Sequence, residues 1–167
     1  MLSELLPRAY SFNFGEARLS LRYDMRALLT LERAGLDYSE VFSDTADGGR
    51  VLAFFTAGLR EDIGSERARD IMRAAGPGDI WRHCRQAVLL ALPEPDPLLL
   101  PDTSTKKSGG NEYLRLRALI CDVMGKPEEF FWGSTLRELL SRWQEYAIAK
   151  GYMKPPERVQ MYDEEGM

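Results

Sequence analysis

Alternating hydrophobic and polar residues near the start of the chain predict a β-hairpin. Aromatic and aliphatic residues occupy every second position on both sides of a short turn that contains Gly15: Tyr10, Phe12, Phe14, Leu19, Leu21 and Tyr23. A period of two around such a turn is typical of paired strands whose hydrophobic side chains share one face. Because an isolated hairpin is only marginally stable in water, we expect that face to pack on the rest of the molecule.

From Asp24 onward the hydrophobic residues recur at helical spacing, which predicts a helical main domain. Asp24 is the candidate N-cap of a first helix that ends at Gly35, because its side-chain oxygen can accept a backbone N–H bond. A short helix with a polar loop and three longer helices are then predicted, over residues 37–49, 50–62, 65–76 and 77–93. Ser65 is the candidate N-cap of the helix that ends at Gly76.

Residues 93–111 differ in composition from both neighbouring segments and predict a linker. Prolines are frequent in this stretch and a glycine pair lies near its end. Proline removes backbone donors and fixes φ, while glycine-rich segments resist ordering. The apolar run at residues 98–100 is instead typical of a segment that docks back on the domain in an extended form.

A second, smaller helical unit is predicted over residues 112–152, followed by a loose acidic tail over residues 153–167. Pro127 suits the first position of a short helix, and Thr135 with Glu138 matches the capping box at the start of the last helix. The helix that ends at Gly125 is expected to carry its apolar residues on one face: Leu116, Leu119, Ile120, Val123 and Met124. The apolar stripe of the last helix is Leu136, Leu139, Leu140, Trp143 and Ala147.

These patterns together predict a mainly α (α+β) protein. An N-terminal hairpin packs on a helical main domain within residues 1–92, and the linker connects that domain to the C-terminal helical unit. No internal repeat with a period of about 20 to 50 residues is found.

Composition and charge narrow the class of protein. The 167 residues are 44% hydrophobic and 29% charged, which is ordinary for one globular domain with or without a small appendage. The formal net charge of −4 argues against nucleic-acid binding, because phosphate recognition needs clustered Lys and Arg. No apolar stretch approaches the ~20 residues that span a bilayer, and no signal-peptide pattern is present. We therefore expect a cytoplasmic protein without a membrane partner.

The sequence contains no pattern of residues typical of catalysis or metal binding. His83 is the only histidine, and its neighbour Cys84 points about 100° away on a helix, so a catalytic pair is not indicated. A zinc site needs three or four Cys or His ligands, which these residues and the distant Cys121 do not form. We expect no enzyme activity, no cofactor and no metal, with both cysteines as buried, reduced thiols.

Aromatic residues are the first candidates for binding a partner. Phe130, Phe131 and Trp132 are adjacent, and Trp143 follows on the last predicted helix. Aromatic side chains are common in cores and also anchor protein interfaces, so both interpretations stay open for the three adjacent residues. Because three successive helical residues cannot face one direction, we expect Phe131 or Trp132 to be available to a partner.

Arginines are the second candidates. They are dense on two neighbouring predicted helices: Arg67, Arg69, Arg73, Arg82 and Arg85. One interpretation is a solvated outer face that pairs with nearby acidic residues. The other is a charged face that binds a partner, and Arg73 and Arg82 are the candidate residues for it.

Two further patterns resemble the tail assembly chaperones of long-tailed bacteriophages and prophages. In the first, a strand is followed by two Leu-rich helical patterns, matched here by Leu28, Leu31, Glu32, Gly35, Leu52, Gly58 and Leu59. The second is similar to the small C-terminal piece of many such systems, and it comprises Met124, Gly125, Pro127, Phe130 or Phe131, Trp132, Thr135 and Glu138. The resemblance covers most of residues 10–147.

The resemblance implies a non-enzymatic protein that binds the tape measure protein while the tail tube polymerises. It implies self-association, the tail tube protein as a second candidate partner, and a place in the bacterial host cytoplasm with absence from the mature virion. The C-terminal piece is often added by a ribosomal frameshift, and residues 103–110 lie where such a fusion falls, although one uninterrupted reading frame is equally compatible. The alternatives are a virion structural protein, such as a head–tail connector or tail-completion protein, and a regulatory or enzyme-accessory module.

Overall fold

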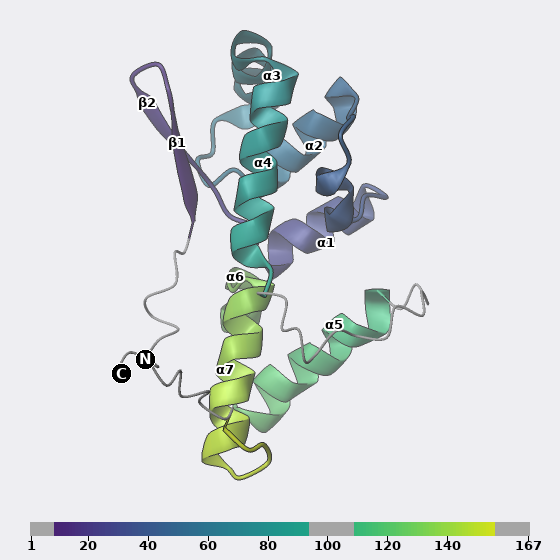
Figure 1. Cartoon of the computed structure of the whole chain (residues 1–167), viewed down its shortest axis with the longest axis vertical. Coiled ribbons are helices and arrows are strands. Elements are labelled where there is room, and N and C mark those ends of the chain that lie inside the picture. The colour runs from purple at the N-terminus through teal and green to yellow at the C-terminus, as the bar shows by residue number, and fades with distance from the viewer. Residues whose placement is uncertain (1–8, 94–108, 156–167) are drawn as a thin grey trace, which may run out of the picture.

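The computed structural model describes residues 9–93 and 109–155, and within these ranges the fold is mainly α-helical (Figure 1). The first part contains β1 (Tyr10–Phe14), β2 (Ala17–Leu21), α1 (Met25–Arg33), η2 (Tyr38–Phe42), α2 (Gly48–Gly58), α3 (Gly64–Ala75) and α4 (Pro77–Ala91). The second contains α5 (Gly109–Arg117), the π-helical η3 (Ala118–Val123), α6 (Glu128–Gly133) and α7 (Leu136–Ala149). The predicted class, a mainly α protein with an N-terminal hairpin packed on helices, is confirmed.

The hairpin is antiparallel and pairs Tyr10 with Leu21 at its open end. Gly15 lies at the first of the two turn positions with a φ of 58°, a left-handed conformation that suits glycine in a tight hairpin turn. The outer edge of β2 is partly covered, because Leu21 forms an antiparallel bridge with Leu59 and the Arg60 N–H donates to the Ser20 carbonyl at 2.9 Å. The segment after α2 therefore fixes the hairpin against the helices.

Helix α4 is the central element of the fold. It packs against both strands and against η2, α2, α3 and α7, and Figure 1 shows it running vertically between the hairpin and α2. Its buried side chains recur at helical intervals, as the sequence predicts: Ile80, Trp81, Cys84, Ala87, Val88 and Ala91. The hydrophobic core of the molecule is therefore built around this helix.

Three of the predicted helix boundaries in the main domain are confirmed and one is wrong. Asp24 caps α1 by accepting the Ala27 N–H, and Gly35 follows that helix with a φ of 75°. Ser65 is not an N-cap, because the chain already turns at Gly64, where φ is 75°, and α3 begins there without a side-chain capping bond. Gly76 ends α3 as predicted.

The C-terminal helices also follow the predicted pattern, with three corrections, the first of which is that Leu140 of the predicted α7 stripe is exposed. Thr135 and Glu138 form the capping box of α7. Pro127 is the N-cap of α6, one position before the first helical residue where it was expected. Val123 is 48% exposed instead of lying on the buried face, because the helix changes to π geometry over η3 and a wider turn shifts side chains around the axis.

The C-terminal helices share the hydrophobic core of the main domain. Helix α6 packs on α1, and α7 packs on α4, so that Ile120, Phe131 and Leu139 belong to the same buried cluster as Phe54 and Val88. That the unit over residues 112–152 is a separate domain stays a prediction.

Most of the predicted linker and tail lies outside the described residues. The structure does not describe residues 94–108 of the predicted linker or residues 156–167 of the predicted tail. Residues 109–111, which end the predicted linker, form the first turn of α5, so this helix begins before the predicted boundary at residue 112.

Candidate functional site

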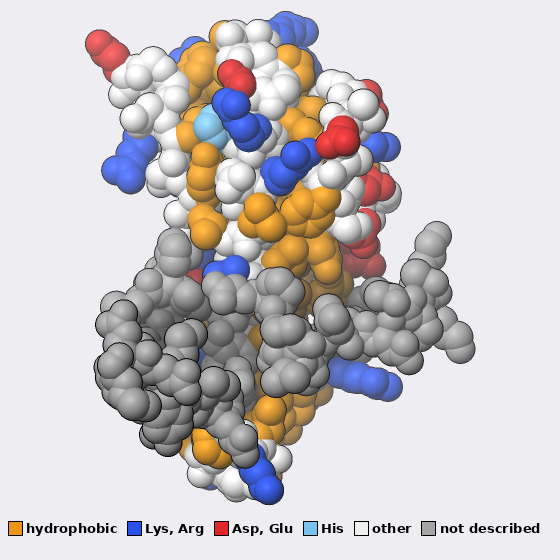
Figure 2. Space-filling view, in the orientation of Figure 1, with side chains coloured by type: hydrophobic (Ala, Val, Ile, Leu, Met, Phe, Trp, Pro, Cys, Tyr) orange, Lys and Arg blue, Asp and Glu red, His pale blue; other side chains and the backbone are white. Residues whose placement is uncertain are grey.

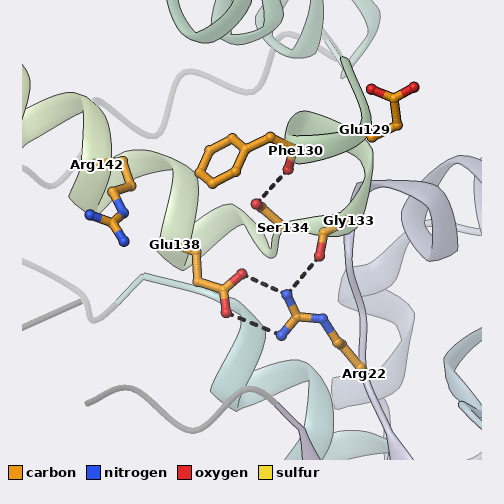
Figure 3. Close-up of a pocket in the computed structure, with 7 residues that line it drawn as sticks. All are labelled: Arg22, Glu129, Phe130, Gly133, Ser134, Glu138 and Arg142. Atoms are coloured by element: carbon orange, nitrogen blue, oxygen red, sulfur yellow. Dashed lines mark hydrogen bonds and ion pairs between the residues drawn. The ribbon is translucent and has the colours of Figure 1, made fainter. Parts of the chain in front are cut away.

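The turn between α6 and α7 is tied to the β2–α1 connection by polar contacts, here named the polar junction (Arg22, Gly133, Ser134, Thr135 and Glu138). The Arg22 guanidinium donates to both oxygens of the Glu138 carboxylate at 3.1 and 2.7 Å and to the Gly133 carbonyl at 2.7 Å (Figure 3). The two side chains are only 9% and 17% exposed. A bidentate pair with so little exposure is stronger and more specific in geometry than a surface ion pair.

Backbone contacts reinforce the polar junction. The Met25 N–H donates to the Ser134 carbonyl at 3.0 Å, and Asp24 and Thr135 form an antiparallel bridge. Glu138 has two roles, because the same carboxylate accepts the Thr135 N–H at 2.8 Å in the capping box. Backbone contacts and the Glu138 side chain thus hold the start of α7 against the start of α1.

A polar cavity of about 270 Å³ adjoins this junction and is also lined by Glu129, Phe130 and Arg142. In Figure 3 the Glu129 carboxylate points away from the Arg22–Glu138 pair. Of the charged residues that line this cavity, Arg22 pairs with Glu138, and Arg142 lies 3.8 Å from Glu145. We assign the polar junction the role of holding α6 against α1.

The candidate binding site is an apolar groove formed by α1, α5 and α6, and the name apolar groove is kept for it below. It has a volume of about 350 Å³ and is lined mainly by hydrophobic side chains: Met25, Leu28, Leu29, Tyr113, Leu114, Phe131 and Trp132. Leu114 is 62% exposed, and Leu29 and Trp132 are half-buried. Residues three and four apart on α1 provide one wall, as the helical period requires.

Three charged residues complete the lining of the apolar groove. Arg117 of α5 and Glu128 of α6 form an ion pair, which raises the pKa of the Arg117 guanidinium. Glu32 of α1 is exposed and has no ion-pair partner among the described residues. The groove is therefore apolar inside, with one unpaired negative charge at its α1 side.

The structure separates the three adjacent aromatics that the sequence singles out. Phe131 is 1% exposed and belongs to the core, although it also lines the apolar groove. Trp132 is half-buried, packs edge-on against Phe131 at 5.1 Å between ring centroids, and lines the apolar groove. Phe130 points to the polar cavity on the other side. Of the three, Trp132 is the one placed to contact a partner in the groove.

The remaining predicted site residues lie elsewhere. Trp143 of α7 is half-buried, stacks on Tyr146 at 5.8 Å between ring centroids, and does not line the apolar groove. Arg73 and Arg82 are exposed on α3 and α4 and lie near Asp70 and Asp79 of their own helices, at 4.0 and 2.9 Å. The structure does not bring these three residues together with the groove.

His83 and Cys84, the residue types most often found in catalytic sites, are both engaged in structural contacts. His83 stacks on Phe12 at 4.1 Å between ring centroids, and its Nδ1 lies 2.9 Å from the Tyr10 hydroxyl. The pKa of the imidazole is lowered mainly by burial and further by the positive charge of Arg82. Figure 2 shows this histidine among hydrophobic side chains. Burial raises the pKa of the Cys84 thiol to about 12, so the reactive thiolate is scarce at neutral pH. Cys84 is buried as predicted, whereas Cys121 is only partly buried.

The described residues contain neither a metal-binding cluster nor a membrane-spanning helix. In the ranges 9–93 and 109–155, no group of three or more His, Cys, Asp or Glu side chains is placed to hold a metal ion. None of the helices described there has the length and apolar character needed to cross a membrane.

Comparison with models of protein families, with curated proteins and with solved structures finds no match. The resemblance to tail assembly chaperones therefore stays a prediction.

Sequence reasoning identified two groove residues for binding, Phe131 and Trp132, and missed the others. Leu28 and Glu32 were recognised as part of a family pattern. Leu29 was one of several leucines at helical spacing, and Leu114 lay outside the predicted apolar face of its helix. Their common groove is visible only when α5 is placed beside α1, because residues far apart in the sequence form its two walls.

Proposed function

We propose that this chain is a tail assembly chaperone of long-tailed bacteriophages or prophages, which binds the tape measure protein without catalysis while the tail tube assembles. Its place is the cytoplasm of the bacterial host, and it is absent from the mature virion. The observation that carries the proposal is the apolar groove, an open hydrophobic site of about 350 Å³ beside Trp132, one of the residues on which the family resemblance depends.

The shape and chemistry of the groove suit this role. A tape measure protein is long and helical, and its exposed apolar stripes would aggregate without cover. A groove between helices accepts the apolar face of another helix, in the manner of other helix-binding proteins. A short groove lined by a few apolar side chains gives moderate affinity, which permits release when the tube closes around the tape measure.

The side chains that most often carry out catalysis are engaged in structural contacts in this protein, which supports a binding role. The only histidine of the chain stacks on Phe12, and Cys84 is fully buried with a raised pKa. Arg22 and Glu138 both line the polar cavity, and they form an ion pair with each other. These side chains stabilise the fold, and the apolar groove is left as the place for a partner.

Co-expression of the full chain with the neighbouring tape measure protein tests the proposal. We expect the two proteins to co-purify, and Trp132→Ala to lower capture at least about tenfold, because aromatic anchors carry much of the binding energy of an interface. Trp143→Ala is the matched control, since Trp143 is also half-buried in the C-terminal helices but lies outside the groove. Circular dichroism melting of both variants separates loss of binding from loss of folding.

The contrary outcomes are distinct. If the chain does not capture the tape measure protein, and a phage that lacks the gene makes normal tails, the proposal is wrong. If mass spectrometry finds the chain in purified virions at a fixed stoichiometry, the protein is a structural component such as a head–tail connector or tail-completion protein.

A further inference from the structure

Glu32 lies where the local electrostatics of its own helix disfavour it. It is in the last turn of α1 (Met25–Arg33), where the negative end of the helix dipole repels a carboxylate and attracts the neighbouring Arg33. Glu32 is exposed and has no ion pair with any described residue. Its charge therefore does not stabilise α1, and it is available to a group outside the chain.

The other charges of the apolar groove cancel. Arg117 and Glu128 pair with each other across the α5–α6 wall, so Glu32 supplies the net charge of the lining. The formal net charge of −4 of the whole chain adds a weaker attraction for a positive partner. A partner that enters the groove thus meets an apolar floor and one carboxylate at the edge.

The dimensions of the groove suit a helix. The α1 wall is a helix of 9 residues, or about 13 Å, which is the length of two to three helical turns. Its groove-lining residues, Met25, Leu28, Leu29 and Glu32, follow one face of that helix, and Leu114 and Tyr113 face them from α5. Two helical walls with an apolar interior are the usual receptor for a third, amphipathic helix.

We propose that the apolar groove binds an amphipathic partner helix whose hydrophobic stripe is flanked by a Lys or Arg, and that Glu32 pairs with that basic side chain. The inference rests on the proposed function and deepens it, because it specifies which segments of a tape measure protein the chain selects. The apolar residues provide the affinity, and Glu32 makes the groove prefer a partner helix with basic side chains beside its hydrophobic stripe over one with acidic side chains there.

Two synthetic peptides of about 18 residues, long enough to populate a helix, test the proposal with the full chain. Both carry the same Leu stripe, flanked by Lys in one and by Glu in the other, and affinities are measured by fluorescence anisotropy. We expect the Lys peptide to bind more tightly. Glu32→Gln should reduce that affinity about two- to fivefold, the range of an exposed ion pair, and Glu32→Lys should reverse the preference.

Matched variants separate the groove from general surface effects. Glu16→Lys makes the same charge change in the exposed hairpin turn and should leave both affinities unchanged. Leu114→Asp should weaken both peptides at least about tenfold because it places a charge in the apolar lining, whereas Leu89→Asp changes an exposed leucine of α4 outside the groove and should not. High salt should reduce the Lys-over-Glu preference.

The inference is overturned if the two peptides bind equally well to the native chain, or if Glu32→Lys and Glu16→Lys act alike. It is also overturned if Leu114→Asp abolishes a dimer while no peptide binds, which assigns the groove to a second copy. Equal binding of the two peptides that becomes tighter after replacement of Leu98, Leu99 and Leu100 by Ser would also overturn it and would assign the groove to the chain's own segment. In each case capture of the whole tape measure protein by the native chain remains a separate result, so the proposed function is judged on its own.

Discussion

The contact between Gly58 and Tyr23 shows how single residues fix the centre of the molecule. Tyr23 is fully buried, and its hydroxyl donates to the Phe54 carbonyl of α2 at 2.7 Å. A Cβ atom added at Gly58 would lie 2.7 Å from the Tyr23 ring. The tyrosine can therefore lie flat against the end of α2 only because residue 58 has no side chain.

Gly58→Ala should lower the free energy of unfolding by about 1–3 kcal/mol, the usual cost of overpacking in a dense core. Tyr23 cannot move away without breaking its hydrogen bond to Phe54. Gly48→Ala, at the first position of the same helix with open space around it, is the control and should change stability little. Urea unfolding measures both, and equal midpoints for the two variants would contradict the packing argument.

Element boundaries were predictable from the sequence where one side chain determines them. Asp24 and the Thr135–Glu138 capping box act within a single helical turn, so their spacing in the sequence contains the whole interaction. Ser65 is also a residue type that favours caps, but it is not one here, because α3 begins at Gly64, two residues earlier than a cap at Ser65 would place it. The π turn of η3 has no sequence signal that helical periodicity can reveal.

Contacts between elements were not predictable in this way. Arg22 is an ordinary polar residue of an alternating pattern, and nothing near it in the sequence points to Glu138, its partner in the polar junction. The apolar groove has the same character, since Leu29 and Leu114 lie far apart in the sequence. Trp132 was found because an aromatic cluster is unusual by itself, whatever it packs against.

The polar junction should stabilise the molecule more than surface ion pairs do. Arg22→Met or Glu138→Gln should each cost about 2–3 kcal/mol, because each leaves a mostly buried group without its charged partner. The double variant should cost no more than the worse single variant. Arg82→Met, which breaks the exposed pair with Asp79, should cost under about 0.5 kcal/mol. Urea unfolding of all four checks this, and additive losses in the double variant would contradict a direct pairing.

At the scale of the whole molecule, the C-terminal helices complete a site that the main domain begins. Helix α1 provides one wall of the apolar groove, α5 and α6 provide the rest, and the polar junction holds α6 in place beside α1. Binding therefore depends on the docking of segments that are distant in the sequence. In the proposed function this arrangement makes the chaperone active only when both parts of the chain are present.

A ¹⁵N NMR titration of the full chain, with overlapping helical segments of the tape measure protein that the proposed function names as the partner, tests the groove most directly. We expect apolar segments with a basic flank to change the signals of the groove residues Leu28, Leu29, Glu32, Leu114 and the Trp132 indole. Signals of the Trp143 indole and of the hairpin turn should stay unchanged. Binding that leaves the groove signals unmoved, or no binding by any segment, would contradict the account.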